Sequence, residues 1–593
     1  MAICPKETID SNVTGLRYAW ERCLKKLAAN PIWKVLEPNS YSDFGATYAL
    51  TARNPINPSR QRKKGSITDM DAQGGFNQDL TQNNLTDLMQ AFFFANARER
   101  GTTHSLVFGD APVSGVAALT SEYTFANLRV ATMAVSAAGT GYRVGDLLTV
   151  TGAATRPAVA YVSAVNTATG AVTAVAIDDA GLYAALPVNP AATTGGSGSG
   201  CTLTLTSAPL TAFAAGQVVL ASGFGLAANN GLKTVVGLAG GVLEVAEALA
   251  DEAAPPAAAK LQAVGFQFDI GDVDVAMNGG LVRLTSSIVD LTTMGLIPGE
   301  WLFVGGDAAG SAFPKSVGFA RVNVVAAGYI ELDKVQWEAP AAESGAAVAL
   351  RIYTGTIIRN EPAPALIVHK PVQLERTLGN DINGVMSEYL TGATANEMTL
   401  NVTEAALCTV DLTFVACAHE PRNGLTGLKT GSRPAMMAED GFNTVDHFAR
   451  IKLSAIDPAS ANPLPLFAHC TDITLTINNN VSGNKAVGTL GAFATTAGTF
   501  EVGGDMTAYF TTIDGPLAIR NNYDVTVDYI LVKGNAGMLW DIPLLGLGGG
   551  GIQVEQDQPV KLPLETSAAE SKFGYTLLMQ NFAYLPDVAA ATV

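Results

Sequence analysis

The sequence predicts a mainly β protein made of several domains. Its 593 residues are too many for one hydrophobic core, so about three to five domains are expected. The chain contains 60 glycines and 28 prolines, and only 15% of its residues are charged. Short strands joined by glycine turns are typical of this composition. Apolar and polar residues also alternate along many stretches, as they do in half-buried strands.

Two distant stretches share one pattern, which indicates a structural unit used twice. Residues 471–510 begin with an alternating strand, break at Asn478, Asn479 and Asn480, pass through a loop that contains Ser and Lys, and end in a second strand. Residues 42–79 follow the same order, with an Asn-Pro break and a loop rich in Ser, Arg and Lys. Self-similarity of this kind predicts a repeated fold.

Helical spacing of apolar residues predicts two helices. Residues 13–30 show this spacing and are predicted to form an N-terminal helix that stops before Pro31, followed by a short strand at 33–36. The strongest helical pattern spans about residues 83–97, and its apolar stripe should pack against a sheet. The stripe consists of Leu85, Leu88, Met89, Phe92 and Phe93.

The middle of the chain has a different texture. Residues 128–208 are nearly all Ala, Gly, Thr and Val, which predicts a small β module inserted into a parent domain. Two patterns of apolar runs between glycine turns follow, and each predicts a small barrel or sandwich. The predicted division is a first repeated region at 1–127, the inserted module at 128–208, small β modules at 209–262 and 263–352, and a second repeated region at 353–593.

The charge balance is acidic. The chain has 36 basic and 53 acidic residues and a net charge of −17. A protein that grips nucleic acid needs a basic face to neutralise phosphates, so the chain as a whole is expected to repel DNA. No apolar stretch has the length of a membrane span, the N-terminus lacks a signal-peptide core, and the six cysteines show no CxxC spacing. We therefore expect a soluble protein made in a cytoplasm, with no membrane contact.

Motifs of catalysis are missing from the sequence. It contains no GxGxxG followed by a helix, no GxxxxGK[ST], no HExxH and no GxSxG. Cys417 and His419 could approach His469 and Cys470 and bind zinc, but their spacing fits no usual zinc site, so buried thiols and hydrogen-bonded imidazoles are favoured. No catalytic, cofactor-binding or metal-binding residue is predicted, and the profile favours assembly over catalysis.

The densest positive cluster lies in the loop 55–65. It consists of Arg60, Arg62, Lys63 and Lys64. One interpretation is a solvated hairpin tip. The other is a contact with an acidic partner surface, and a second copy of this acidic chain would provide one.

Three groups of motifs carry a family resemblance. They are Arg53-Asn54-Pro55-Ile56 with Gly75-Phe76-Asn77-Gln78-Asp79, Leu475-Thr476-Ile477-Asn478 with Thr507-Ala508-Tyr509-Phe510, and Asp541-Ile542-Pro543-Leu544 with Leu562-Pro563-Leu564-Glu565. These segments resemble the tail tube (major tail) proteins of long, flexible-tailed, siphovirus-like bacteriophages. The resemblance covers roughly residues 30–105 and 210–590. Residues 128–208 resemble instead the glycine–tyrosine β modules that recur as insertions in phage structural proteins.

The resemblance implies a structural virion protein of the phage tail and not an enzyme. Such a protein forms rings that stack into a hollow tube for DNA ejection, and its β-sandwich with a flanking helix pairs inner strands with neighbouring subunits. The implied partners are further copies of the chain, a tape measure protein, and tail terminator and distal tail proteins. An acidic lumen would let DNA slide without specific binding. No cofactor is implied.

The repeated unit bears on the ring. Two tube folds per chain favour trimeric rings with pseudo-sixfold symmetry, whereas two halves of one fold require hexameric rings. The candidate assembly residues are Arg60, Arg62, Lys63, Lys64, Asn478, Asn479 and Asn480. Reversing the four basic residues to Glu is expected to block polymerisation.

Two other functions fit parts of the sequence. A tail-tip or fibre adhesin that binds the host surface would share the Gly/Thr-rich β texture, but it should show aromatic-lined sugar sites and a fibrous repeat. A secreted β-helical polysaccharide lyase should show a signal peptide and short coil repeats. Neither set of features is evident in the sequence.

Overall fold

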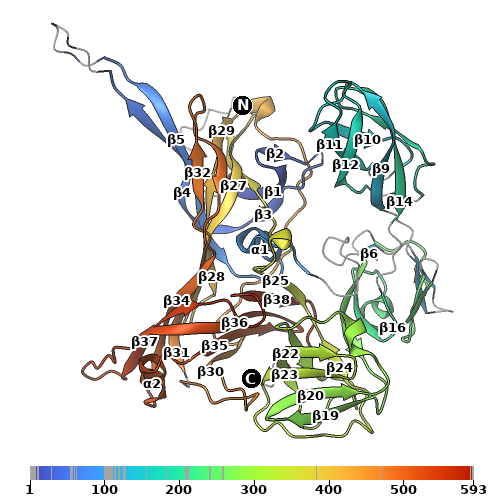
Figure 1. Ribbon diagram of the computed structural model, residues 1–593, viewed down its shortest axis with the longest axis vertical. Helices are drawn as coiled ribbons and strands as arrows, with labels where there is room; N and C mark the ends of the chain where they lie inside the picture. The colour runs from blue at the N-terminus through green and yellow to red at the C-terminus, as the bar shows by residue number, and fades with distance from the viewer. Residues whose placement is uncertain are drawn as a thin grey trace, which may run out of the picture.

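The computed structural model confirms a mainly β protein with several antiparallel sheets (Figure 1). Its described part contains two short α-helices, and short 3-10 turns that include η3 (Ala227–Asn229), η4 (Leu291–Met294), η5 (Pro364–Leu366) and η6 (Gly424–Thr426). The structure describes residues 9, 13–28, 30–53, 56, 58, 61, 63–98, 111–112, 115–117, 121–124, 129–154, 157–181, 183, 185–207, 213–239, 242–256, 259–381, 384–467, 469–587 and 589.

A first repeat combines strands from distant parts of the chain. It consists of β1 (Gly15–Cys23), β4 (Pro38–Thr51), β5 (Ser66–Asp79), α1 (Thr86–Phe93), β26 (Val372–Asp381), β27 (Gly384–Thr403), β28 (Thr409–Ala416) and β29 (Ala418–Arg422). The short strands β2 (Lys26–Leu27) and β3 (Lys34–Leu36) pair with β1.

A second repeat follows directly in sequence. It consists of β30 (Phe448–Ala455), β31 (Cys470–Asn478), β34 (Glu501–Tyr509), α2 (Asp514–Arg520), β35 (Val525–Lys533), β36 (Ala536–Gly549), β37 (Lys561–Ala568) and β38 (Leu578–Phe582). Between β31 and β34 lies a small hairpin of β32 (Ser482–Lys485) and β33 (Ala492–Thr496). β25 (Thr356–Arg359) pairs with β38.

The two repeats use the same strand pairings in the same order. The pairs β1–β26, β4–β5, β5–β28, β26–β27, β27–β28 and β27–β29 of the first repeat match β30–β35, β31–β34, β34–β37, β35–β36, β36–β37 and β36–β38 of the second. In both repeats a helix follows the second strand of the first hairpin. The repetition predicted from residues 42–79 and 471–510 is therefore present in the topology.

One continuous sheet joins the repeats. Pairing of β27 with β31 gives the strand order β4-β5-β28-β27-β31-β34-β37-β36. One side of this sheet covers the largest hydrophobic cluster, which includes Phe76, Met398, Leu412, Ile477 and Val502. The register places these five side chains in one row across the strands. We call the opposite side of the eight strands the polar face.

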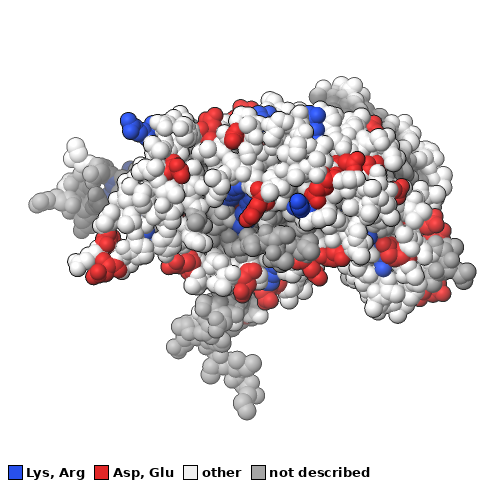
Figure 2. Space-filling view, turned by 90° about the horizontal axis from the view of Figure 1, so that it is seen from below, with Lys and Arg blue, Asp and Glu red and all other residues white. Residues whose placement is uncertain are grey.

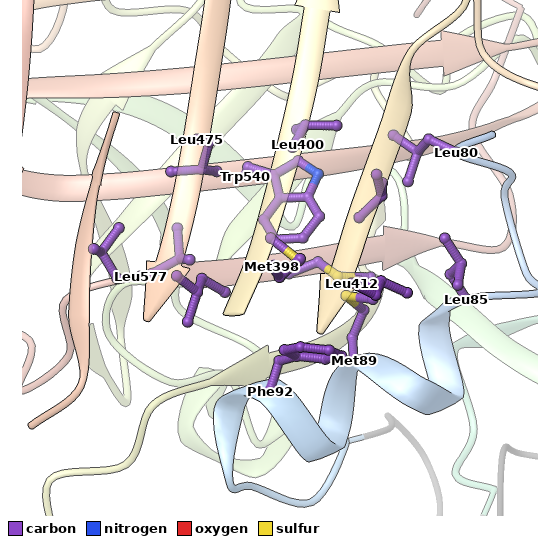
Figure 3. Packing of buried hydrophobic residues seen from close by; sticks show 14 of the residues in the cluster. Leu80, Leu85, Met89, Phe92, Met398, Leu400, Leu412, Leu475, Trp540 and Leu577 are labelled. Carbon is purple, nitrogen blue, oxygen red and sulfur yellow. The ribbon is translucent and has the colours of Figure 1, made fainter. Parts of the chain in front are cut away.

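The helix α1 packs under this sheet, as its apolar stripe predicts. Figure 3 shows Met89 and Phe92 of α1 pointing toward Met398 and Leu412 of the sheet, and Leu85, just before the helix, belongs to the same cluster. Phe92 is fully buried and meets the ring of Phe414 edge-on, at a centroid distance of 5.3 Å. The helix α1 is therefore part of the hydrophobic core.

The predicted helix at 13–30 is wrong. Most of this stretch is the strand β1, whose two edges pair with β26 and β3. Leu16 and Tyr18 are buried while Arg17 between them is not, which is the alternation of a strand. Local spacing resembled a helix, but pairing on both edges satisfies the backbone polar groups of β1 and decides its conformation. The predicted strand at 33–36 is confirmed as β3.

A long insertion separates α1 from β25 in the first repeat. In the second repeat the equivalent connection between α2 and β35 is only a short turn. Much of the insertion forms a 13-stranded sheet. Its strands are β6 (Ala111–Pro112), β7 (Gly115–Ala117), β8 (Glu122–Thr124), β15 (Gln217–Ser222), β16 (Gly231–Ala239), β17 (Val242–Val245), β18 (Lys260–Gln267), β19 (Val273–Asn278), β20 (Leu281–Ser286), β21 (Trp301–Val304), β22 (Gly318–Ala326), β23 (Tyr329–Val335) and β24 (Arg351–Tyr353).

A small, nearly closed barrel is nested in this insertion, between β8 and β15. It consists of β9 (Val130–Thr140), β10 (Leu147–Val150), β11 (Val159–Val165), β12 (Val172–Asp179), β13 (Ala191–Thr194) and β14 (Ser199–Ser207), and it encloses its own core. The barrel lies beside β1 and β2 of the first repeat (Figure 1). Arg22 in β1 contacts Asp178 at 3.4 Å and lies over the ring of Tyr161.

The insertion also contacts the second repeat through buried charges. Arg321 in β22 pairs with Asp541 in β36 at 3.2 Å and with Asp333 in β23 at 2.9 Å. Lys334 in β23 pairs with Asp528 in β35, and both side chains are almost fully buried. Because buried charges are costly unless they are paired, these contacts hold β22 and β23 against the second repeat in one arrangement.

Candidate functional surface

The polar face carries rows of hydroxyl, amide and carboxylate side chains. One row runs across the strands through Asn77, Asp411, Thr399 and Thr476, at positions directly opposite one another. The alternation of each strand places these residues on the side away from the core. The Nδ2 of Asn77 donates to Asp411 at 2.8 Å, and Thr399 and Thr476 exchange a hydrogen bond at 3.1 Å. Cross-strand pairs of this kind stabilise a solvated sheet face.

Carboxylates dominate the charge of the polar face. The acidic side chains at these positions are Asp71, Asp79, Glu397, Asp411, Asp472, Glu501, Asp505 and Glu565. On the described strands of this face, Lys561 in β37 is the basic residue in an equivalent position. Acidic side chains also prevail on the side of the molecule shown in Figure 2. The face is therefore suited to lie beside a polyanion without binding it.

The eight-stranded sheet ends in two open edges. β4 pairs with β5 on one side and has no second strand among the described residues. At the other end, β35 pairs along one edge of β36 as far as Leu545, and no described strand continues along that edge. These edges lie at opposite ends of the sheet (Figure 1). Open edges present unpaired backbone donors and acceptors and are templates for pairing with another chain.

The junction between the repeats shows how these edges can be used. Along the equivalent edge of β27, β26 pairs as far as Ala393 and β31 takes over from Glu397. β31 is the counterpart of β4, and β27 is the counterpart of β36. One chain thus contains one complete junction, between β27 and β31. It also contains the two edges, on β4 and on β36, that a second junction of this kind would need.

Residue equivalence between the repeats follows from the register. β28 begins opposite Asp79, and β37 begins opposite Tyr509. Phe76 and Met506, which the same alignment matches, both face the core. The alignment also matches Asp71 with Glu501 and Thr47 with Asn478, since each of these pairs faces the other across its hairpin.

The connections within the two hairpins differ. Residues 479–500 leave the sheet and form the hairpin β32–β33, whose Lys485 contacts Asp69 and Asp71 of β5 at 2.5 and 2.6 Å. The hydrogen bond from Lys485 lowers the pKa of Asp69, and the two carboxylates raise the pKa of Lys485. Beyond Thr47 and Asp71, β4 and β5 continue to Thr51 and from Ser66 as an extended arm that projects from the body (Figure 1). Tyr48, Leu50 and Ile67 on this arm are exposed apolar side chains.

The sequence-predicted assembly residues fall into two groups. Arg60 and Arg62 lie outside the described residues, while Lys63 and Lys64 are exposed near the end of the arm.

The asparagine run forms contacts within the chain. Asn478 ends β31, and its Oδ1 accepts a hydrogen bond from the backbone N–H of Asn480. Asn479 is buried and donates to the carbonyl oxygens of Phe92 and Ala395 at 3.0 and 3.2 Å. Asn480 adopts a positive φ of 48°, a conformation that Asn tolerates better than most residues. These side chains direct the chain away from the sheet toward β32.

Sequence reasoning did not single out the acids of the polar face or Lys485. The alternation of Thr and Asp with buried residues in β28 and β31 was a usable signal for the face. The partners of Lys485 lie more than 400 positions away, in β5, so no local pattern could reveal them.

The residues considered for zinc have other surroundings. The Nε2 of His419 lies 2.9 Å from Oε2 of Glu388, and burial raises the pKa values of Cys417 and Cys470. Within the described ranges, no group of three or more His, Cys, Asp or Glu residues could hold a metal ion. In the same part of the chain, no helix is long and apolar enough to cross a membrane.

A comparison with protein families finds a match to part of the chain. Residues 289–568 match a family model described as phage tail tube protein. The matched region begins in the insertion and extends through β26–β29 of the first repeat to β37 of the second. A comparison with curated proteins found no match.

Proposed function

We propose that this chain forms the hollow tail tube through which DNA leaves the virion, because residues 289–568 match the family model described as phage tail tube protein. Tail tube proteins are structural proteins that polymerise, and the phage tail is a part of the virion. The observation that carries the proposal is the pair of matching open edges on a duplicated fold. We infer assembly in the host cytoplasm and contact with tape measure, tail terminator and distal tail proteins at the ends or within the tube.

The proposed contact between chains repeats the junction inside one chain. β4 of one copy takes the place along β36 of the next copy that β31 takes along β27. If β4 pairs with β36 in the register that β31 uses on β27, the pairing begins near Gly548 and continues past the end of β36. Ile552 and Val554 there are exposed, and so are Tyr48 and Leu50 next to the β4 edge. Pairing would remove apolar surface from water and satisfy both edges.

The duplication favours three chains per ring. Two repeats in each chain supply two of six equivalent positions, so three chains close a ring with pseudo-sixfold symmetry. Each chain then contributes eight strands of the sheet to a continuous barrel. A hexameric ring would be needed if each repeat were only half of a tube fold. This alternative is disfavoured, because each repeat contains a full set of matching strand pairs and its own helix.

The polar face is proposed to line the lumen. Closing the ring at the β4 and β36 edges encloses one side of the sheet, and the other side is occupied by the core and α1. The carboxylates on the polar face repel phosphates, so DNA slides along this wall without specific binding.

We propose a division of the chain into two tube folds and an insertion. Residues 1–127 and 353–593 supply the tube folds, and 128–208 is an inserted module that contains the barrel β9–β14. Residues 209–262 and 263–352 are two small β modules that share one sheet, since β18 extends across the division between them. Separate hydrophobic clusters in these parts support the division.

A proline at the β36 edge tests the proposal. The backbone N–H groups of Gly550 and Gln553 bond to β37, whereas a side chain at Gly551 would meet no atom within 4 Å. Gly551→Pro removes a donor on the open side of the extension and adds bulk there, so it should block pairing with β4 while the isolated chain still folds. The matched control, Gly551→Ala, should assemble like the wild type.

Electron microscopy and native mass measurement of both variants provide the readout. The wild type and Gly551→Ala are expected to give rings with an open centre and a mass of three 61.4 kDa chains, and stacked tubes at higher concentration. Gly551→Pro is expected to remain a folded monomer. Normal tubes from Gly551→Pro would contradict the proposed junction, and rings of six chains would contradict the proposed three chains per ring.

A further inference from the structure

One amine and two carboxyl groups meet in a buried contact between the insertion and the second repeat. Lys334 projects from β23, and its Nζ contacts a carboxylate oxygen of Asp528 in β35. Asp541 in β36 is directly opposite Asp528 in the β35–β36 pairing, so the two carboxyl groups lie side by side. Each of these three side chains is at most 2% exposed. The amine is therefore held against a carboxyl group where water is excluded.

The surroundings of the contact favour proton transfer between these groups. Burial, with repulsion from Arg321 and Arg450, lowers the pKa of Lys334. Burial raises the pKa of Asp541, so this side chain can hold a proton and donate it. Despite its burial, Asp528 has a lowered pKa because of Arg450, at 2.9 Å, and Lys334. Arg450 can also stabilise negative charge that develops on the Asp528 oxygens during a reaction.

We propose that Lys334 and Asp528 condense to an isopeptide bond, which joins the insertion covalently to the second repeat. A proton first passes from Nζ of Lys334 to the Asp528 carboxylate, and the amine lone pair then attacks Cγ of Asp528. As the C–N bond forms, Asp541 donates its proton to the departing oxygen and takes one proton back from the nitrogen. One water molecule leaves, and Asp541 returns to its starting state. No oxidant, nucleotide or other co-reactant is consumed.

Two features of the fold promote a condensation that is slow and unfavourable in water. Docking of β23 on β35 fixes the amine beside the carboxyl group, which is equivalent to a very high local concentration of amine. The contact is buried, so the released water molecule can leave while bulk water cannot reach the new amide. The inference goes beyond the proposed function and is independent of it, because all the residues belong to one chain.

The first repeat provides an internal comparison. Its carboxylate equivalent to Asp528 is Glu375, since the two occupy matching positions in the pairing with the next strand. Glu375 is fully buried as well, but its cationic partner is Arg433, at 2.6 Å. A guanidinium group keeps its proton in proteins and does not act as an amine nucleophile. The second repeat presents the amine of Lys334 instead, so the bond is expected there and not in the first repeat.

Mass measurement of the full chain under denaturing conditions tests the bond. The wild type should be lighter than its unmodified chain by one water molecule, whereas Lys334→Met should have the full mass of its sequence. The matched control is Lys572→Met, which removes a partly exposed lysine that pairs with Asp333 at the edge of the same cluster. This control should still lose the water molecule. A wild type of full mass would overturn the proposal, and so would a loss of water that persists in Lys334→Met.

Cleavage of the chain gives a second, independent measurement. The sequence contains a single Asp-Pro bond, between Asp457 and Pro458, and mild acid hydrolyses this type of bond selectively. The cut falls between Lys334 and Asp528, so an isopeptide bond keeps the two fragments together on a reducing, denaturing gel. The cleaved wild type should run as one branched product, and cleaved Lys334→Met should separate into two fragments. Separation of the wild-type fragments would overturn the proposal.

The variant Asp541→Asn tests the proton relay. The amide has nearly the size of the carboxyl group but cannot donate and recover the proton. Chains made by cell-free translation begin without the bond, so samples cleaved at successive times follow its formation. Because general acid–base catalysis contributes about 10²–10⁴-fold, the bond should form at least about a hundredfold more slowly in this variant. Formation at the wild-type rate would contradict the role given to Asp541.

Discussion

Individual buried charges hold the insertion against the second repeat. Asp528 in β35 is fully buried and lies close to two cations, Lys334 and Arg450, the second at 2.9 Å. Despite its burial, these neighbours lower the pKa of Asp528. Lys452 in β30 lies in the same cluster, and its Nζ donates a hydrogen bond to Asn462. Burial, with repulsion from Arg450 and Lys334, lowers the pKa of Lys452 to about 7.

Replacing Lys452 should make stability less dependent on pH. The ordinary lysine pKa of 10.5 applies to the unfolded chain, so between pH 7 and 10.5 the unfolded state binds more protons than the folded state. Wild-type stability therefore rises with pH in this window, as the cost of keeping a buried lysine charged disappears. Lys452→Met should be more stable than the wild type at pH 7, by about 1–2 kcal/mol.

Thermal unfolding at pH 7 and at pH 10 measures this difference. The gap between Lys452→Met and the wild type should shrink as the pH rises. Lys533→Met, which changes a lysine on the surface of the same repeat, serves as the control and should track the wild type. A gap that stays constant between the two pH values would contradict the low pKa of Lys452.

The sequence could not predict these charges. Lys452, Asp528 and Asp541 look like ordinary polar residues in alternating strands, and Arg321 lies more than 200 positions from Asp541. Their burial is created by docking of the insertion on β35 and β36, which is a tertiary event. In contrast, the polar residues of β28 and β31 could be assigned to an exposed face from alternation alone, since their partners are neighbouring strands.

At the scale of elements, the sequence predicted secondary structure correctly where burial of one side of an element determines its pattern of apolar residues. The stripe from Leu85 to Phe93 predicted α1, because a helix buried on one side needs apolar residues at that spacing. It failed for β1, whose mixed pattern of Leu16, Ala19 and Cys23 also fits a helix. Pairing with β26, a strand more than 350 residues away, decides that case.

Truncating Phe92 should destabilise the core shared by α1 and the sheet. The ring is fully buried and contacts Phe414 of β28. Phe92→Ala leaves a cavity under the sheet and should cost about 3–5 kcal/mol of unfolding free energy. Phe493→Ala, which changes an exposed phenylalanine of the hairpin β32–β33, should cost far less. Denaturant titrations followed by intrinsic fluorescence compare the two variants, and equal losses would contradict a core role for α1.

At the scale of the whole molecule, duplication accounts for features that no single element explains. The two repeats share one fold, and β4 and β36 are the counterparts of β31 and β27, which pair with each other inside the chain. The unpaired edges of β4 and β36 can therefore pair in the same way between two copies. The sequence revealed the repetition in residues 42–79 and 471–510. It did not reveal that one sheet joins both repeats, because the pairing of β27 with β31 depends on strands with no shared local pattern.

The charge of the polar face determines whether the tube retains DNA. Asp411, Asp505 and Glu565 lie on this face, on three different strands. Changing all three to Lys in every chain replaces carboxylates with ammonium groups along the proposed lumen. Each ammonium group that contacts a phosphate adds nearly one unit to the salt dependence of binding. Tubes of this variant should therefore hold duplex DNA at low salt and release it as salt rises.

Protection from nuclease distinguishes the lumen from the outer surface. Tubes are incubated with short duplex fragments, treated with nuclease, and assayed for surviving DNA. The control changes Glu244, Asp269 and Glu338, which are exposed acids of the insertion, to Lys, and thus alters the net charge equally. Wild-type and control tubes should protect no DNA, since any fragment on the outside remains accessible. Protection by the control, or its absence in the polar-face variant, would show that this face does not line the channel.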